Sequence, residues 1–219
     1  LLRQCSLWHT MSHLNILPFL GYRLGEDPCI ILPWCSNGNI SKFLLDHPEI
    51  QRSEKILLLH QAALGLQHLH SRDPPVVHGN ICPENVLIND LKAAVLSDFD
   101  LSRAIEEKTG FTTTGAGGQA NRYLAPEAFT ADWPSSATFP TDIYAFGGLI
   151  LTAMSGRPPH HHILGVGRYL LAVMAGAVPT PTDHPGLPEA DSLWNLMSTC
   201  WASAPYERPS IHKVVNFVR

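Results

Sequence analysis

The residues best suited to chemistry stand at the two ends of one short stretch. Asn85 comes just before the run Val86–Ile88, and Asp98 follows shortly after the run Ala94–Leu96. An Asn-Asp pair at 89–90 lies between the two runs, which predicts a β-hairpin. Because a hairpin brings its ends together, we expect Asn85 and Asp98 to converge. An amide oxygen and a carboxylate are hard ligands that suit Mg²⁺, so this hairpin is a candidate metal site.

Regular elements must surround this hairpin to position it. The residue patterns predict strands over 15–22 and 29–32 and a loop over 33–38. They predict a helix that begins at an N-cap at Ser53 and ends near Ser71. Further helices are predicted over 1–14, 39–45, 141–155, 164–175 and 191–201, and after Pro209. The helix over 141–155 is apolar nearly all round, which predicts that it is central and buried. Few strands followed by many helices indicate an α-rich α+β domain.

Composition limits the class of protein. The chain has 219 residues, 45% of them hydrophobic, and a formal net charge of −4 without a run of Lys or Arg. This argues for a folded core and against a nucleic-acid or anionic-membrane partner. The five cysteines are odd in number and form no C-x-x-C pair, which favours a reducing, intracellular and cytoplasmic location. The longest apolar stretch, around 143–154, is too short to span a membrane.

The hairpin region resembles two sequence motifs of the protein kinase family. The catalytic-loop pattern H-R-D-L-K-x-x-N is matched by HGNICPEN at 78–85, and the D-F-G pattern by Asp98-Phe99-Asp100. Downstream, Ala125-Pro126-Glu127 matches the A-P-E that ends the activation segment. Asp142 matches the aspartate that opens the central helix, and Arg208 the late arginine that pairs with the A-P-E glutamate. The chain is most similar to the tyrosine-kinase-like serine/threonine branch.

This resemblance implies one α+β, protein-kinase-like domain over residues 1–219. Residues 1–32 would be a remnant of the N-terminal lobe, with the end of its regulatory helix and two of its strands. Residues 33–38 would be the hinge, and residues 39–219 the helical C-terminal lobe. The resemblance further implies ATP and Mg²⁺ as cofactors, with the nucleotide near Leu32, Pro33, Trp34, Asn85 and Asp98, and the metal on Asn85 and Asp98.

Two departures from the family pattern bear directly on catalysis. The aspartate that accepts the proton of the substrate hydroxyl is replaced by Asn80, whose amide cannot take a proton. General base catalysis contributes roughly 10²–10⁴ in rate. The lysine that places positive charge near the transferring phosphate is replaced by Cys82, and charge stabilisation is often the largest catalytic contribution. The resemblance is therefore to a catalytically impaired pseudokinase.

Other family positions are changed as well. The glutamate of the regulatory helix falls at Gln4, the D-F-G glycine at Asp100, and a small hydroxylated residue of the substrate-receiving loop at Ala120. The Gly-rich loop and the strand lysine that hold the phosphates are not among these residues. The resemblance is thus to a truncated pseudokinase.

Three functions remain open from the sequence. The first is a kinase-fold binding or scaffolding module with a protein partner and without phosphate transfer. The second is an active serine/threonine kinase whose N-terminal lobe lies outside this fragment. The third is a sensor that binds Mg-ATP through the hinge, Asn85 and Asp98 but does not turn it over.

Several residues are expected to have structural roles instead of chemical ones. His78 should pack and hydrogen-bond to backbone, and Asp142 should hold the catalytic-loop backbone. Glu127 and Arg208 should form a buried ion pair. The three histidines at 160–162 are expected in an exposed loop, since adjacent residues cannot all face one metal ion.

Three further features could serve binding or regulation. Cys82 is a candidate reactive thiol, although no Lys or Arg beside it would lower its pKa. The threonines at 109 and 112–114 could accept phosphate or simply belong to a polar loop. An apolar face around 16–20 and 30–32 is the expected contact site if no further strands cover it.

Overall fold

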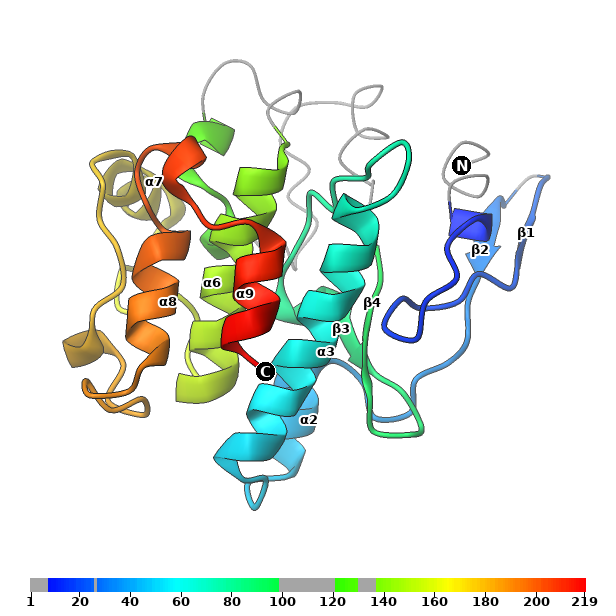
Figure 1. Cartoon of the computed structure of the whole chain (residues 1–219), viewed down its shortest axis with the longest axis horizontal. Coiled ribbons are helices and arrows are strands. Elements are labelled where there is room, and N and C mark those ends of the chain that lie inside the picture. The colour runs from blue at the N-terminus through cyan, green and yellow to red at the C-terminus, as the bar shows by residue number, and fades with distance from the viewer. Residues whose placement is uncertain (1–7, 26, 99–120, 130–136) are drawn as a thin grey trace.

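The computed structural model describes residues 8–25, 27–98, 121–129 and 137–219. Its helices are α2 (Ile40–Asp46), α3 (Arg52–His70), α6 (Phe139–Ser155), α7 (Val166–Met174), α8 (Leu193–Cys200) and α9 (Ile211–Phe217). Its strands form two antiparallel pairs, β1 (Gly21–Arg23) with β2 (Cys29–Ile31) and β3 (Val86–Ile88) with β4 (Ala94–Leu96). Figure 1 shows the helices gathered in one body, with the β1–β2 ribbon at its right-hand edge. The fold is the helix-rich α+β class that the sequence predicts.

Short 3₁₀ helices join these elements. They are η1 (Pro83–Asn85), η3 (Asn121–Tyr123), η4 (Pro126–Phe129), η5 (Pro181–Asp183) and η6 (Pro205–Glu207). The expectations for Gln4, Asp100, Ala120 and the threonines at 109 and 112–114 fall outside the described residues.

Helix α6 is the centre of the core. Every residue from Thr141 to Met154 is buried, as its continuous apolar sequence predicts. Thr138 caps its start, because the Thr138 side chain accepts from the backbone N–H of Thr141 and the Thr141 side chain accepts in return. Gly156 ends it in the left-handed conformation, at φ 76°, which costs glycine little. Helices α3 and α8 both pack against α6.

The N-cap of helix α3 lies two residues before its predicted position. It is Gln51 and not Ser53, because the Gln51 backbone N–H donates to the Glu54 side chain at 2.9 Å and the helix begins at Arg52. Ser53 already lies inside the helix. The expected position of Glu54 in the first turn and the end near Ser71 are both confirmed.

The predicted β3–β4 hairpin is confirmed, and it pairs Val86 with Leu96 and Ile88 with Ala94. Its turn is shaped by Asn89, whose side-chain oxygen accepts from the backbone N–H groups of Leu91 and Ala93 at 3.0 and 2.9 Å. Local turn chemistry therefore determines how the two ends of the hairpin meet.

The predicted strand over 15–22 is mostly not a strand. Only Gly21–Arg23 pairs with β2, while Ile16 forms an isolated parallel bridge with Leu96. Pro18 lies between the two, and a proline has no N–H to donate to a ladder. The segment therefore changes partner at this point, from the β3–β4 hairpin to β2.

The segment before β1 is bound closely to the helical body. Asn15 is buried and donates from its side chain to the carbonyl of Ala94 at 2.9 Å, while its own carbonyl accepts from Leu96 N–H at 2.9 Å. Gly65 of α3 allows this approach, since a Cβ there would lie 2.4 Å from the Asn15 carbonyl oxygen.

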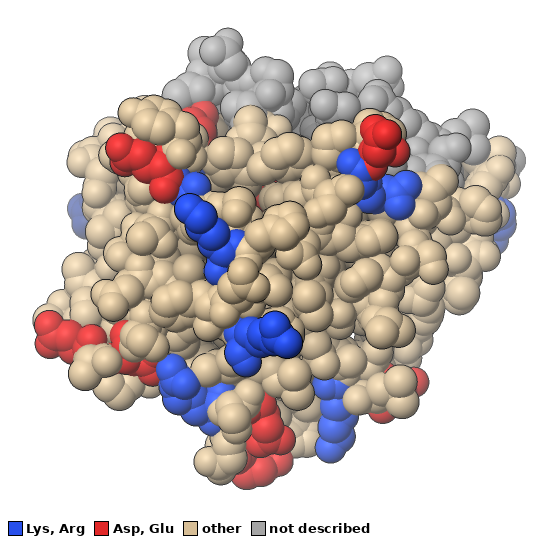
Figure 2. Space-filling model, viewed as in Figure 1, with Lys and Arg blue, Asp and Glu red and all other residues tan. Residues whose placement is uncertain are grey.

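Figure 2 shows acidic and basic side chains scattered over one face in small mixed groups. No helix among the described residues is long and apolar enough to cross a membrane.

Candidate functional site

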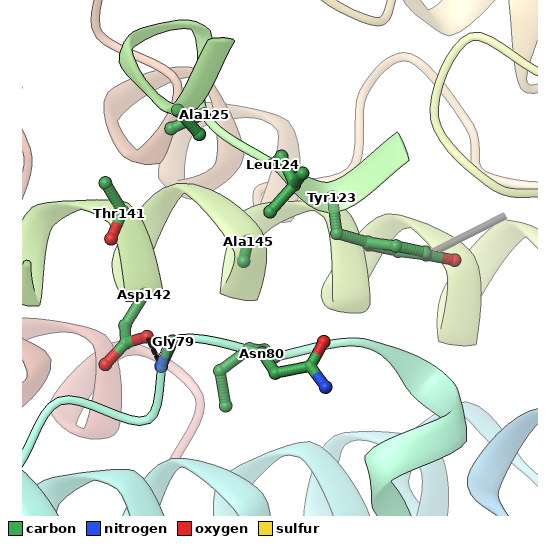
Figure 3. Close-up of a pocket in the computed structure, with 10 residues that line it drawn as sticks. Gly79, Asn80, Tyr123, Leu124, Ala125, Thr141, Asp142 and Ala145 are labelled. Carbon is green, nitrogen blue, oxygen red and sulfur yellow. Dashed lines mark hydrogen bonds between the residues drawn. The ribbon is translucent and has the colours of Figure 1, made fainter. Parts of the chain in front are cut away.

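The loop from His78 to Asn85 is held in place by α6. The Asp142 carboxylate accepts from the backbone N–H groups of His78 and Gly79, both at 2.8 Å, and contacts His70 Nε2 at 2.8 Å. Asp142 is buried at the first turn of α6, which explains why its position is fixed. Figure 3 shows Asp142 reaching from α6 to Gly79, with Asn80 further along the same loop. The role predicted for Asp142 is confirmed.

His78 is fully buried beside this aspartate. Burial lowers the pKa of His78 to about 4, although the nearby Asp142 carboxylate acts in the opposite direction. Its Nδ1 accepts from the backbone N–H of Asn80 at 3.2 Å. A neutral, buried imidazole that bonds backbone fits the structural role expected from the sequence.

Asn80 occupies the position of the family's proton acceptor. The backbone carbonyl of Asn80 accepts from the side-chain amide of Asn85 at 2.8 Å, so this bond joins the middle of the loop to its end. In Figure 3 the Asn80 amide points away from Asp142. The loop therefore keeps its shape although the side chain at position 80 is not ionisable.

Cys82 is only 2% exposed. Burial, followed by the nearby Glu84 carboxylate, raises the pKa of the Cys82 thiol to about 12. At neutral pH the side chain is therefore an uncharged thiol that solvent scarcely reaches. The hypothesis of a reactive thiol is wrong, because low-dielectric surroundings disfavour the thiolate.

The hairpin brings the two candidate metal ligands to the same end. The Ser97 N–H donates to the Asn85 carbonyl at 2.9 Å, and Asp98 follows directly. Asp98 has φ 56°, and burial raises the pKa of its carboxyl group. A carboxylate that loses hydration on burial is the kind of group that a bound cation would stabilise.

The donors at this end suit Mg²⁺ chemically. The Asn85 side-chain nitrogen donates to the Asn80 backbone carbonyl, so its side-chain oxygen is the atom that could bind a metal. Mg²⁺ usually takes one or two protein ligands and completes its shell with phosphates and water. Among the described residues there is no group of three or more His, Cys, Asp or Glu that could hold a metal alone.

The expected hinge residues have different environments. Leu32 packs against the core, whereas Trp34 is 87% exposed. Pro33 has no backbone N–H, so it offers a nucleobase only its carbonyl oxygen. Pro33 and Trp34 line a groove of about 760 Å³ whose lining does not include Asn85 or Asp98.

The predicted ion pair between Glu127 and Arg208 is confirmed. Arg208 Nη2 donates to Glu127 Oε2 at 2.9 Å, and the guanidinium group also donates to the carbonyls of Pro140 and Ala202 at 3.1 and 3.0 Å. It also lies over the ring of Tyr144, 5.0 Å from the ring centre. The pair fixes the segment that carries η4 against the C-terminal helices.

The expectation that His160–His162 form an exposed loop is partly wrong. His162 is exposed, but His160 is only 3% exposed and has φ 51°. It packs against the ring of Tyr169, with ring centres 5.9 Å apart. In this left-handed conformation His160 is buried while His162 is exposed. The sequence alone does not predict such a difference between neighbouring histidines.

Two important contacts have no clear signal in the sequence. His70 ends α3 yet meets Asp142 across the fold. Arg122 donates to the carbonyls of His160 and Ile163, and so joins the segment before Glu127 to the loop after α6. Both depend on chain segments that are distant in sequence.

The loop held by the first turn of α6, the hairpin behind it and the Glu127–Arg208 pair together define the C-terminal lobe of a protein kinase fold. The family model described as protein tyrosine and serine/threonine kinase matches residues 1–218. The chain belongs to this family.

Relatives within the family include receptor-interacting serine/threonine-protein kinase 3 of Rattus norvegicus, 31% identical over 95% of this chain. Receptor-interacting serine/threonine-protein kinase 2 of Bos taurus is 24% identical over 97% of it. L-type lectin-domain containing receptor kinase IV.2 of Arabidopsis thaliana is 30% identical over 95%. The matches cover 46%, 41% and 33% of these relatives, so the chain spans less than half of each.

Proposed function

We propose that the chain is a pseudokinase module that binds a protein partner and does not transfer phosphate. The observation that supports this proposal is that positions 80 and 82 carry residues unable to do the chemistry, while the loop that contains them is still held by Asp142 of α6. Asn80 cannot accept a proton, and Cys82 is buried with a pKa raised to about 12, so it supplies no positive charge. Neither the base nor the cation of phosphoryl transfer is supplied by the loop.

A second candidate is a Mg-ATP sensor. It is favoured by Asp98, whose carboxyl pKa is raised by burial and which stands beside Asn85 at the end of the hairpin. When bound, Mg²⁺ would supply the charge that holds the nucleotide phosphates. The proposed division into a remnant lobe (1–32), a hinge (33–38) and a helical lobe (39–219) would place Leu32, Pro33 and Trp34 near the base.

Thermal unfolding with ATP separates these candidates. A ligand that binds only the folded state at about 100 times its Kd stabilises it by about 2.7 kcal/mol. For a domain of this size that raises Tm by roughly 5–10 °C. We expect no rise with ATP and Mg²⁺. A rise that requires Mg²⁺ and is lost in Asp98→Asn would support the sensor instead.

Phosphate transfer to a general protein substrate tests the enzyme reading directly. We expect no transfer above background from the 219-residue chain, and none from Asn80→Asp, because Cys82 still supplies no positive charge. Transfer that Asp98→Asn abolishes would contradict the pseudokinase proposal. Asp27→Asn, at an exposed carboxylate in the β1–β2 turn, is the matched control.

A further inference from the structure

A groove of about 760 Å³ lies away from the catalytic loop, where three segments meet. They are residues 11–18, the segment 33–35 and the β3–β4 turn at 89–91. Figure 1 shows these segments together between the β1–β2 ribbon and the turn of the green hairpin. The volume falls within the range of about 300–1,000 Å³ that is typical of ligand sites.

The groove combines a buried apolar floor with an exposed apolar rim. Its floor includes Ile16 and Leu17, which are each 2% exposed. Its rim carries Leu14, Trp34 and Leu91, which are 90%, 87% and 88% exposed. Large apolar side chains that stay exposed around one hollow are a candidate interaction surface. Tryptophan is also one of the residue types enriched among binding hot spots.

The charge of the lining points to one kind of occupant. Asp90 is the single Asp, Glu, Lys or Arg among the described residues that line the groove. Asp90 Oδ1 accepts from the Ser36 hydroxyl at 2.8 Å, which holds the carboxylate at the rim. The pKa of His13, which also lines the groove, is lowered by burial and by the nearby His68, and both effects disfavour its charged form. A cationic group is therefore favoured beside Asp90, and the exposed face of Trp34 can also attract it.

We propose that this groove binds a segment of a protein partner that carries large apolar side chains and one Arg or Lys. The apolar side chains would fill the hollow beside Leu14 and Leu91, and the cation would lie between Asp90 and Trp34. A second copy of this chain fits less well, because a two-fold contact would bring two Asp90 carboxylates into one interface. This assignment deepens the proposed binding function and names its surface.

The contact face expected from the sequence, around 16–20 and 30–32, is partly corrected. Ile16 and Leu17 are buried beneath the groove, whereas Leu20 and Ile31 are exposed, at 63% and 47%. Leu14, Trp34 and Leu91 are more exposed than either and lie around the groove itself. The contact surface proposed here is therefore centred on these three residues.

The test is selection from a displayed library of random peptides on the immobilised 219-residue chain, without nucleotide. Binders to Leu91→Glu are removed by counter-selection. We expect the enriched peptides to pair apolar residues with an Arg or Lys. Binding of one synthetic, labelled peptide is then measured by fluorescence anisotropy. We expect Trp34→Ala to weaken it by at least about tenfold.

A double-mutant cycle tests the charge pairing. Replacing the peptide's basic residue with Gln should weaken binding to the native chain by about 3–10-fold. The same replacement should have little effect on the Asp90→Asn variant. Tyr206→Ala and Leu45→Glu change exposed apolar residues elsewhere, at 86% and 79% exposure, and should leave affinity unchanged.

Several results would overturn the proposal. They are the absence of enrichment, enrichment of acidic peptides, equal binding to Trp34→Ala, and a dimer in light scattering that Leu91→Glu dissociates. The ATP and phosphate-transfer measurements report on the loop around Asn80 and Asp98. The proposal that the groove binds a peptide can therefore be disproved while the pseudokinase proposal stands, and the reverse also holds.

Discussion

At the scale of single residues, burial decides what a titratable side chain can do. Cys82 and His78 lie in the loop that carries the chemistry of a kinase, yet both are held in their uncharged forms at neutral pH. Burial also raises the pKa of the Asp98 carboxyl group, which favours its neutral form. The loop thus keeps its shape while its capacity to hold charge is reduced.

Buried histidines give stability a defined pH dependence. Burial lowers the pKa values of His78, His160 and His184 to about 4, from 6.5 for an ordinary histidine. Between these pH values the unfolded chain binds protons that the folded chain does not. The free energy of unfolding should therefore fall as pH decreases through this window, and remain constant above it as far as these residues are concerned.

We predict that His160→Asn reduces this pH dependence. Asparagine cannot titrate, and it tolerates the left-handed conformation that His160 adopts. The measurement is the free energy of urea unfolding between about pH 7 and pH 5. His212→Asn changes an exposed histidine of α9 and should preserve the wild-type slope. A slope unchanged in His160→Asn would contradict the role of burial.

At the scale of elements, close approach between α3 and the segment before β1 joins the two parts of the fold. The Asn15 carbonyl oxygen lies within 2.4 Å of the position that a Cβ atom on Gly65 would take. The same carbonyl also accepts from the backbone N–H of Leu96. The β3–β4 hairpin, α3 and this segment are therefore positioned together, and the hairpin and the segment before β1 both contribute residues to the lining of the groove.

We predict that Gly65→Ala lowers the free energy of unfolding by about 1–3 kcal/mol, the usual cost of overpacking. The added Cβ would lie 2.4 Å from the Asn15 carbonyl oxygen, so backbone would have to shift. Urea unfolding measures the effect. Gly167→Ala in α7 is the matched control, since a Cβ there meets no atom within 4 Å. Equal stability of the two variants would argue against a tight contact.

At the scale of the whole molecule, Arg208 connects segments that are far apart in the chain. Its guanidinium group meets Glu127, Pro140 and Ala202 while its side chain is fully buried. A buried pair of this kind need not add net stability, but removal of one partner leaves the other charge uncompensated.

We predict that Arg208→Ala lowers Tm by several degrees. Loss of one partner of a fully buried pair typically costs about 3–5 kcal/mol, and the 25% exposure of the Glu127 side chain reduces that cost here. Differential scanning calorimetry measures the change. Arg52→Ala removes an arginine that is 51% exposed and paired with Asp191, so a much smaller shift is expected. If the two variants melted alike, the Glu127–Arg208 pair would have no special structural role.

The sequence alone determined the hairpin, the central helix and the family. Two short apolar runs around an Asn-Asp turn, a continuous apolar helix and ordered motifs are local patterns, and each can be recognised from neighbouring residues alone. The same patterns identify Asn80 and Cys82 as substitutions. These features could be predicted because they do not depend on which distant segments later come into contact.

Only the tertiary structure decided the burial of Cys82 and His160, the change of strand partner at Pro18, and the groove bordered by Trp34 and Leu91. Each results from contacts between segments that are remote in the chain. The sequence specifies which groups are present at the candidate site. Their environment, which fixes charge and accessibility, arises only when the chain packs.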